Sequence, residues 1–178
     1  MKRFISIMFT ILIILCFAAC SSSKVPTHEE VKIAYQQAVE AYSWFDLTTM
    51  PIAENSEIEY NGNIYYKVNH SSIKSLSDLE TYLHSLFSDN IVDTLLKYDR
   101  YVDIDGVLYA IPADRGTNIF AGEEHHEIIN ESDKRIIYKV SVDILDETLE
   151  KVVDKEVYSF NYELLKDKWV FTNFSLVR

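Results

Sequence analysis

The last quarter of the chain carries the pattern that most restricts its fold. Turn residues divide this region into three long segments, Arg135 to Leu145, Leu149 to Leu164 and Lys168 to Val177. They are rich in Ile, Val, Tyr and Phe, and in Ser159-Phe160-Asn161-Tyr162 polar and aromatic residues alternate with the period of a half-buried β-strand. Three such strands with short connections predict an antiparallel meander.

The first half of the chain predicts helices. Thr27-His28-Glu29-Glu30 has the form of a capping box, and the apolar residues after it recur at helical spacing, so we expect a helix that ends near Trp44. Ser77-Asp78-Leu79-Glu80 predicts the start of a second helix by the same reasoning. Ser88 and Asp89 are expected to cap a third, shorter helix.

Two dipeptides predict β-hairpins. Asn61-Gly62 separates residues 58–60 from 64–68, and Asp105-Gly106 separates residues 101–104 from 107–111. Both suit the positive φ angles of a type I′ turn. We expect residues 47–55 to form a connection, marked by Pro51.

Helices and hairpins followed by a meander predict an α+β fold. Residues 27–178 are expected to form one domain, with two small lobes as the upper limit for this length. A helix wrapped by a meander is also the shape of cystatin-like and NTF2-like domains, and that shape hosts many unrelated functions.

The N-terminal residues predict export and lipidation. Lys2 and Arg3 precede an uncharged apolar run that is too short to span a membrane, which is typical of a signal peptide covering residues 1–19. Phe17-Ala18-Ala19-Cys20 resembles a bacterial lipobox, although Leu is usual at the position of Phe17. We expect Cys20 to carry the lipid, residues 20–26 to form a tether, and the domain to stand on the outer face of the cytoplasmic membrane. The alternative is a plain signal peptide with an incidental cysteine.

Charge and cysteine content exclude several classes of function. The chain has 17 Lys and Arg residues against 28 Asp and Glu, a formal net charge of −11, which disfavours nucleic-acid binding. Its two cysteines, Cys16 and Cys20, both precede the predicted domain. The domain therefore has no disulfide, no thiolate nucleophile and no cysteine ligand for a metal.

Residue patterns for catalysis are missing from the sequence. It has neither a Gly-x-Ser-x-Gly elbow nor a glycine-rich phosphate loop. His125 and His126 are adjacent, so on a strand they point to opposite faces and cannot both bind one metal ion. We therefore predict a protein that is not an enzyme and that uses no metal or cofactor.

The longest irregular stretch, Pro112 to His126, lies between the second hairpin and the meander. Long loops in small domains are often functional, although a structural connection packed against its own hairpin is an equal alternative. Pro112 fixes one backbone angle, and we expect Gly116 and Gly122 to permit tight bends.

The segment Ile111-Pro112-Ala113-Asp114-Arg115-Gly116-Thr117-Asn118 resembles the IseA-type DL-endopeptidase inhibitor family. The likeness extends in order over most of the predicted domain, from Tyr42-Ser43-Trp44-Phe45 to the hairpin residues Gly106 to Tyr109. The family pattern usually has Gly at the position of Arg115.

That resemblance implies a secreted bacterial protein that blocks NlpC/P60 cysteine peptidases, the enzymes that cut peptidoglycan stem peptides. It implies occlusion of the peptidase cleft by the loop and, we expect, action as a monomer. The expected contact residues are Pro112, Asp114, Arg115, Gly116, Thr117 and Asn118.

Two rival functions remain open from the sequence. One is a lipoprotein that binds a small ligand or glycan in a pocket lined by Tyr138, Tyr158 and Trp169. The other is a metal-dependent enzyme that uses His125 and His126.

Overall fold

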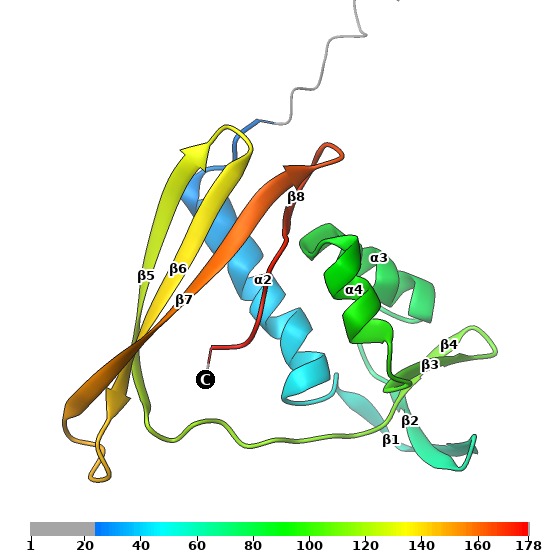
Figure 1. Ribbon diagram of the computed structural model, residues 1–178. Helices are drawn as coiled ribbons and strands as arrows, with labels where there is room; N and C mark the ends of the chain where they lie inside the picture. The colour runs from blue at the N-terminus through cyan, green and yellow to red at the C-terminus, as the bar shows by residue number, and fades with distance from the viewer. Residues whose placement is uncertain (1–23, 178) are drawn as a thin grey trace, which may run out of the picture.

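The computed structural model describes residues 24–177, and these form three helices and two four-stranded antiparallel sheets. The predicted α+β fold class is confirmed. In chain order the elements are α2 (His28–Asp46), β1 (Ile52–Tyr60), β2 (Asn63–Val68), α3 (Leu76–Leu86), α4 (Asp89–Leu96), β3 (Tyr101–Ile104), β4 (Val107–Ala110), β5 (Ala121–Ser132), β6 (Arg135–Leu145), β7 (Val152–Leu165) and β8 (Lys168–Phe171). Figure 1 shows the larger sheet alongside α2, with α3 and α4 beside that helix and the smaller sheet below them. No helix among residues 24–177 is both long and apolar enough to cross a membrane.

The smaller sheet consists of the two predicted hairpins, joined side by side in the order β1-β2-β4-β3. Asn61 and Gly62 have φ angles of 51° and 77°, and Asp105 and Gly106 have 53° and 77°. Positive φ at both central residues is what a type I′ turn requires, so both turn predictions are confirmed. β1 begins at Ile52, so the expected connection over residues 47–55 is shorter than predicted.

The larger sheet has the order β5-β6-β7-β8 and contains the predicted meander. Its last strand ends at Phe171 instead of continuing to Val177. The Asn173 side chain accepts a hydrogen bond from the Asn161 amide (2.6 Å) and donates one to the Ser159 carbonyl (2.8 Å), so it replaces further strand pairing. The chain then turns inward and packs the Phe174 ring 4.8 Å from the ring of Phe160.

β5 corrects the predicted extent of the irregular stretch. Residues 121–126 are not loop but the first half of this strand, which pairs with β6 from Ala121↔Ile144 to Ser132↔Arg135. The hydrophobic pattern fails here because the strand lies at the sheet edge and most of its side chains are exposed. Backbone pairing, which leaves no hydrophobic period, defines the strand.

The helix starts follow the capping predictions with two differences. Ser88 is the N-cap of α4, as predicted, but its side chain makes no capping hydrogen bond. Thr27 and Glu30 form the predicted capping box of α2. In α3 the N-cap is Ser75 and its partner is Asp78, not the Ser77–Glu80 pair that the sequence suggested. The Asp78 carboxylate accepts hydrogen bonds from the amides of Lys74 (3.0 Å) and Ser75 (2.9 Å), so the earlier start satisfies two donors that would otherwise lack partners.

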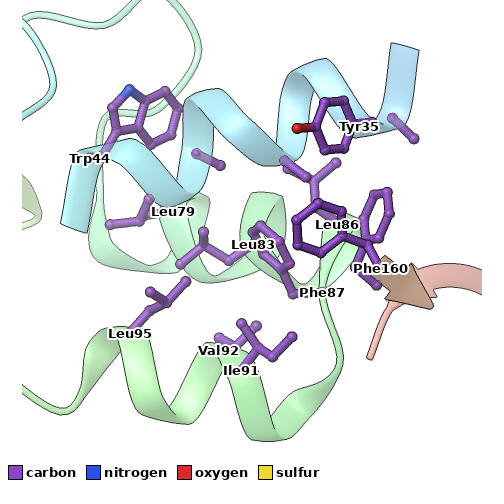
Figure 2. Packing of buried hydrophobic residues seen from close by; sticks show 14 of the residues in the cluster. Tyr35, Trp44, Leu79, Leu83, Leu86, Phe87, Ile91, Val92, Leu95 and Phe160 are labelled. Carbon is purple, nitrogen blue, oxygen red and sulfur yellow. The ribbon is translucent and has the colours of Figure 1, made fainter. Parts of the chain in front are cut away.

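One continuous hydrophobic cluster connects the helices with both sheets. Leu79 and Leu83 of α3 are fully buried between α2 and α4, as Figure 2 shows. Leu108 of the smaller sheet and Ile136 of the larger sheet belong to the same cluster. Tyr35 of α2 is also buried in it, and its ring stacks on Tyr138 of β6 at 4.2 Å.

Candidate functional site

Residues 111–120 form the connection between β4 and β5 and carry all the predicted contact residues. In Figure 1 this connection runs from the smaller sheet to the larger sheet, past the C-terminal end of α2. The six residues that were expected to make contacts are all exposed: Pro112, Asp114, Arg115, Gly116, Thr117 and Asn118. We call residues 111–120 the bridging loop.

The first half of the bridging loop is held to the chain segment that follows α2. The Ala113 amide donates a hydrogen bond to the Thr49 hydroxyl at 2.8 Å, and that hydroxyl in turn donates one to the Ile111 carbonyl at 3.1 Å. The Arg115 amide donates to the Leu47 carbonyl at 2.8 Å. These contacts fix the backbone on both sides of Asp114.

The second half is held to the larger sheet. The Phe120 carbonyl accepts from the Leu145 amide at 2.8 Å, and the Asn118 side chain accepts from the Phe120 amide at 3.0 Å. Gly116 and Thr117 therefore lie between two anchored halves. The loop is therefore anchored to the segment after α2 and to the larger sheet, and its role stays a prediction.

The two glycines do not act as expected. Gly116 has open space where a Cβ would lie and does not have a positive φ. Gly122 lies in β5, where an added Cβ would come within 3.1 Å of the Asp143 carbonyl oxygen and 3.3 Å of the Leu145 side chain. The glycine that matters is therefore needed for close packing at the base of the loop, not for a bend within it.

Asp114 and Arg115 place a negative and a positive side chain next to each other on the exposed side of the loop. The Arg115 guanidinium lies 3.4 Å from the Asp46 carboxylate at the end of α2, and its side chain is 62% exposed. Among the described residues, the Asp114 side chain has no hydrogen bond or ion pair. A free carboxylate and a loosely paired guanidinium are available to a partner, because an exposed ion pair contributes little to folding.

A buried tyrosine supports the segment that holds the loop. The Tyr101 hydroxyl donates to the Trp44 carbonyl at 3.1 Å and accepts from the Met50 amide at 3.0 Å. Burial raises the pKa of Tyr101 to about 12. Arg100 adds two hydrogen bonds, to the carbonyls of Trp44 (3.2 Å) and Thr48 (3.1 Å).

Sequence reasoning missed these supporting residues. Thr49 and Arg100 are ordinary polar residues outside any periodic pattern, and each acts on backbone groups more than 50 positions away in the chain. Only the tertiary arrangement identifies them. Pro51, directly after this segment, was the single local sign of a fixed backbone there.

The histidine pair lies on opposite faces of β5, as predicted. His125 Nε2 lies 3.4 Å from an Asp143 carboxylate oxygen on the outer face. His126 Nδ1 lies 3.2 Å from the Tyr138 hydroxyl under α2. Among residues 24–177, no group of three His, Cys, Asp or Glu residues is placed to hold a metal ion.

The rival ligand pocket is not built from the aromatic residues that were named for it. An open groove of about 360 Å³ runs along α2 and has Tyr138 in its wall. Trp169 instead packs on Tyr162, with ring centroids 5.6 Å apart, and Tyr158 stacks over Phe160 at 6.4 Å. The three predicted rings therefore do not converge on one cavity.

The lipidation site and signal peptide, Cys20 and residues 1–19, lie outside the described residues.

Comparison with curated proteins gives no match. A family model described as IseA DL-endopeptidase inhibitor matches residues 22–175. Membership of this family implies an inhibitor with a peptidase target and not an enzyme. Because the match covers most of the chain, the protein belongs to the IseA DL-endopeptidase inhibitor family, as its resemblance implied.

Proposed function

We propose that this protein inhibits NlpC/P60 cysteine peptidases of the cell wall by placing the bridging loop in their active-site cleft. The observation that carries the proposal is the loop itself, which is exposed at every predicted contact residue yet anchored at both ends. An inhibitor of this kind needs no catalytic group. It needs a segment that is already ordered, because ordering on binding would reduce affinity.

The side chains of the loop suit a polar cleft. Asp114 offers a carboxylate to a cationic or hydrogen-bond-donating group near the peptidase cysteine and histidine, and Arg115 offers donors to carbonyls or carboxylates. Thr117 adds a small hydroxyl at an exposed position of the loop. Occupation of the cleft by these groups excludes both the stem peptide and the water needed for hydrolysis.

Charge supports the choice of a basic partner. Asp114 lies in a protein with a formal net charge of −11, and Glu123 and Glu124 follow the loop in β5. A negative surface accelerates encounter with a positively charged enzyme, and the effect weakens with salt.

The fold also suits attachment to a membrane through Cys20. α2 begins at His28 at one end of the larger sheet, and the bridging loop lies toward the other end, as Figure 1 shows. The 19 residues of this helix span roughly 28 Å at about 1.5 Å per residue. A lipid at Cys20 would therefore hold the loop away from the outer face of the membrane, within reach of enzymes near it.

The test mixes residues 21–178 with a purified NlpC/P60 peptidase from the same organism and follows hydrolysis of a muropeptide. We expect inhibition that Asp114→Ala or Arg115→Ala weakens without lowering the melting temperature. Asp93→Ala and Lys97→Ala, at exposed positions of and after α4, are matched controls. An unchanged hydrolysis rate at large inhibitor excess would refute the proposal.

Lipidation is tested separately. Expression of the full chain in a bacterium should place it in the membrane fraction, and Cys20→Ser should release it. Mass spectrometry of the wild-type N-terminus should find a diacylglyceryl group on Cys20. An unmodified Cys20 in a released protein would favour the plain signal peptide.

A further inference from the structure

An exposed apolar patch lies at the hairpin between β6 and β7. Leu149, Val152, Val153 and Val157 are 49%, 55%, 63% and 61% exposed. We call these four residues the hairpin patch. Scattered apolar residues are normal on a surface, but four within nine positions indicate a contact surface.

The backbone at the tip supports this interpretation. Leu149 has a φ of 61°, in the left-handed region that favours Gly or Asn over a bulky side chain. The Asp146 carboxylate holds the turn by accepting from the Thr148 hydroxyl (2.8 Å) and from the Glu150 amide (3.2 Å). A leucine at a strained, exposed position buries little of its side chain in the fold, so that side chain is available for binding.

The exposed edge of β7 is poorly suited to pairing with another strand. β8 pairs only with Tyr162 to Leu165, so residues 152–157 have a neighbour on one side alone. Val153 is skipped in the register, because Leu145 pairs with Val152 and Ile144 with Asp154. A bulge of this kind protects an edge from strand addition. Contact through side chains is therefore favoured over extension of the sheet.

Charge around the patch selects the kind of partner. Residues 143–156 contain six acidic residues and two lysines, Lys151 and Lys155. A second copy of the chain would bring two negative hairpins together, which like-charge repulsion disfavours. A surface with an apolar area rimmed by Lys or Arg would gain from both the apolar contact and the charge.

The hairpin patch lies at the end of the sheet where the bridging loop enters it. The Leu145 amide at the hairpin base donates to Phe120 of the loop, and Ala121 pairs with Ile144. Figure 1 shows the hairpin and the loop at the same end of the larger sheet, away from the start of α2. We propose that the hairpin patch is a second docking element, which contacts a basic, apolar surface of the same peptidase beside its cleft. This inference rests on the proposed function.

The test compares Leu149→Asn/Val157→Thr with wild-type residues 21–178 against the NlpC/P60 peptidase. We expect an inhibition constant about tenfold higher for the double variant, because two apolar contacts are lost. Asparagine tolerates the left-handed region, so the melting temperature should be unchanged or higher by up to about 3 °C. Ile64→Thr, on an equally exposed residue of β2 in the other sheet, is the matched control and should inhibit like wild type.

Three results would overturn the inference, and they are distinguishable. If wild type inhibits and the double variant inhibits equally, the loop acts without the hairpin patch. If wild type does not inhibit, the proposed function fails first. If wild type alone elutes as a dimer on a sizing column and the double variant as a monomer, the occupant of the patch is a second copy.

Salt dependence tests the charge of the partner. Glu147→Gln/Glu150→Gln leaves the hairpin patch intact and should flatten the rise of the inhibition constant with salt. An unchanged salt dependence would contradict a basic partner surface at this hairpin.

Discussion

The hydroxyl of Thr49 gives the sharpest test of whether the bridging loop is held in advance. Replacement by valine keeps the shape and the branched Cβ but removes the acceptor of the Ala113 amide, 2.8 Å away, and the donor to the Ile111 carbonyl. A typical hydrogen bond contributes about 1 kcal/mol net, and an unsatisfied buried donor costs about 1–3 kcal/mol. Since this site is only partly buried, we expect Thr49→Val to destabilise the closed loop by about 1–2 kcal/mol.

That energy corresponds to an opening equilibrium shifted roughly 5- to 30-fold. Amide hydrogen exchange at Ala113 should therefore accelerate by about this factor, while the amides of α3 keep their protection. The inhibition constant should rise by no more than the same factor, because only the closed population binds.

Thr94→Val is the control for this experiment. It removes a hydroxyl that donates to the Asn90 carbonyl at 2.8 Å within α4 and makes no hydrogen bond to the bridging loop. Exchange at Ala113 should be unaffected. If Thr49→Val left exchange at Ala113 unchanged, the hydrogen bonds of the Thr49 hydroxyl would not hold the loop. The proposal that the loop is ordered before binding would then lose its main support.

Four further predictions concern residues that support the loop and residues that cap two helices. Tyr101→Phe should lower the free energy of unfolding by about 1–3 kcal/mol in urea denaturation, because it leaves the Met50 amide without its acceptor and removes one of the two donors to the Trp44 carbonyl. Because Tyr101 has a raised pKa, its neutral form stabilises the fold below about pH 10, and wild type should lose stability as pH rises from there toward 12. Gly122→Ala should destabilise by about 1 kcal/mol or more and raise exchange at Leu145, since the new methyl group crowds that side chain. Hydrogen bonds from backbone amides and from capping hydroxyls lower the pKa of Glu30 and of Asp78, so the melting temperature should fall as pH drops below about 4, and less steeply in Asp78→Asn.

Local chemistry explains which elements could be predicted from the sequence. The turn at Asn61-Gly62 was predictable because few residues accept two consecutive positive φ angles. The start of α2 was predictable because Thr27 and Glu30 satisfy each other's backbone donors within one turn. Two overlapping capping boxes are possible at the start of α3, Ser75 with Asp78 and Ser77 with Glu80. The first forms, and Asp78 accepts an additional hydrogen bond from the Lys74 amide.

The remaining elements depend on contacts between distant segments. β5 could not be recognised at Glu123 and Glu124 because its partner strand, not its own hydrophobic pattern, makes it a strand. The end of β8 at Phe171 could not be predicted, because it depends on a contact with the neighbouring strand. There the Asn173 side chain accepts the hydrogen bond of the Asn161 amide in place of a further strand residue. The start of the loop was located correctly and its end was placed too late, whereas Thr49, which holds the loop, carries no local signal.

The position of the bridging loop explains how an exposed segment can stay ordered without a disulfide. One half is bonded to the segment after α2 and the other to the end of β6, and the continuous core fixes these two supports relative to each other. The core therefore sets the span of the loop, and Gly116 and Thr117 are left between its anchors. Side chains in that middle can change with little effect on folding, whereas changes at the anchors alter the shape that is presented. Inhibitor specificity would accordingly vary at Asp114 to Thr117, where a substitution changes contacts and leaves the anchors in place, whereas a change of the Thr49 side chain would weaken inhibition by loosening the loop.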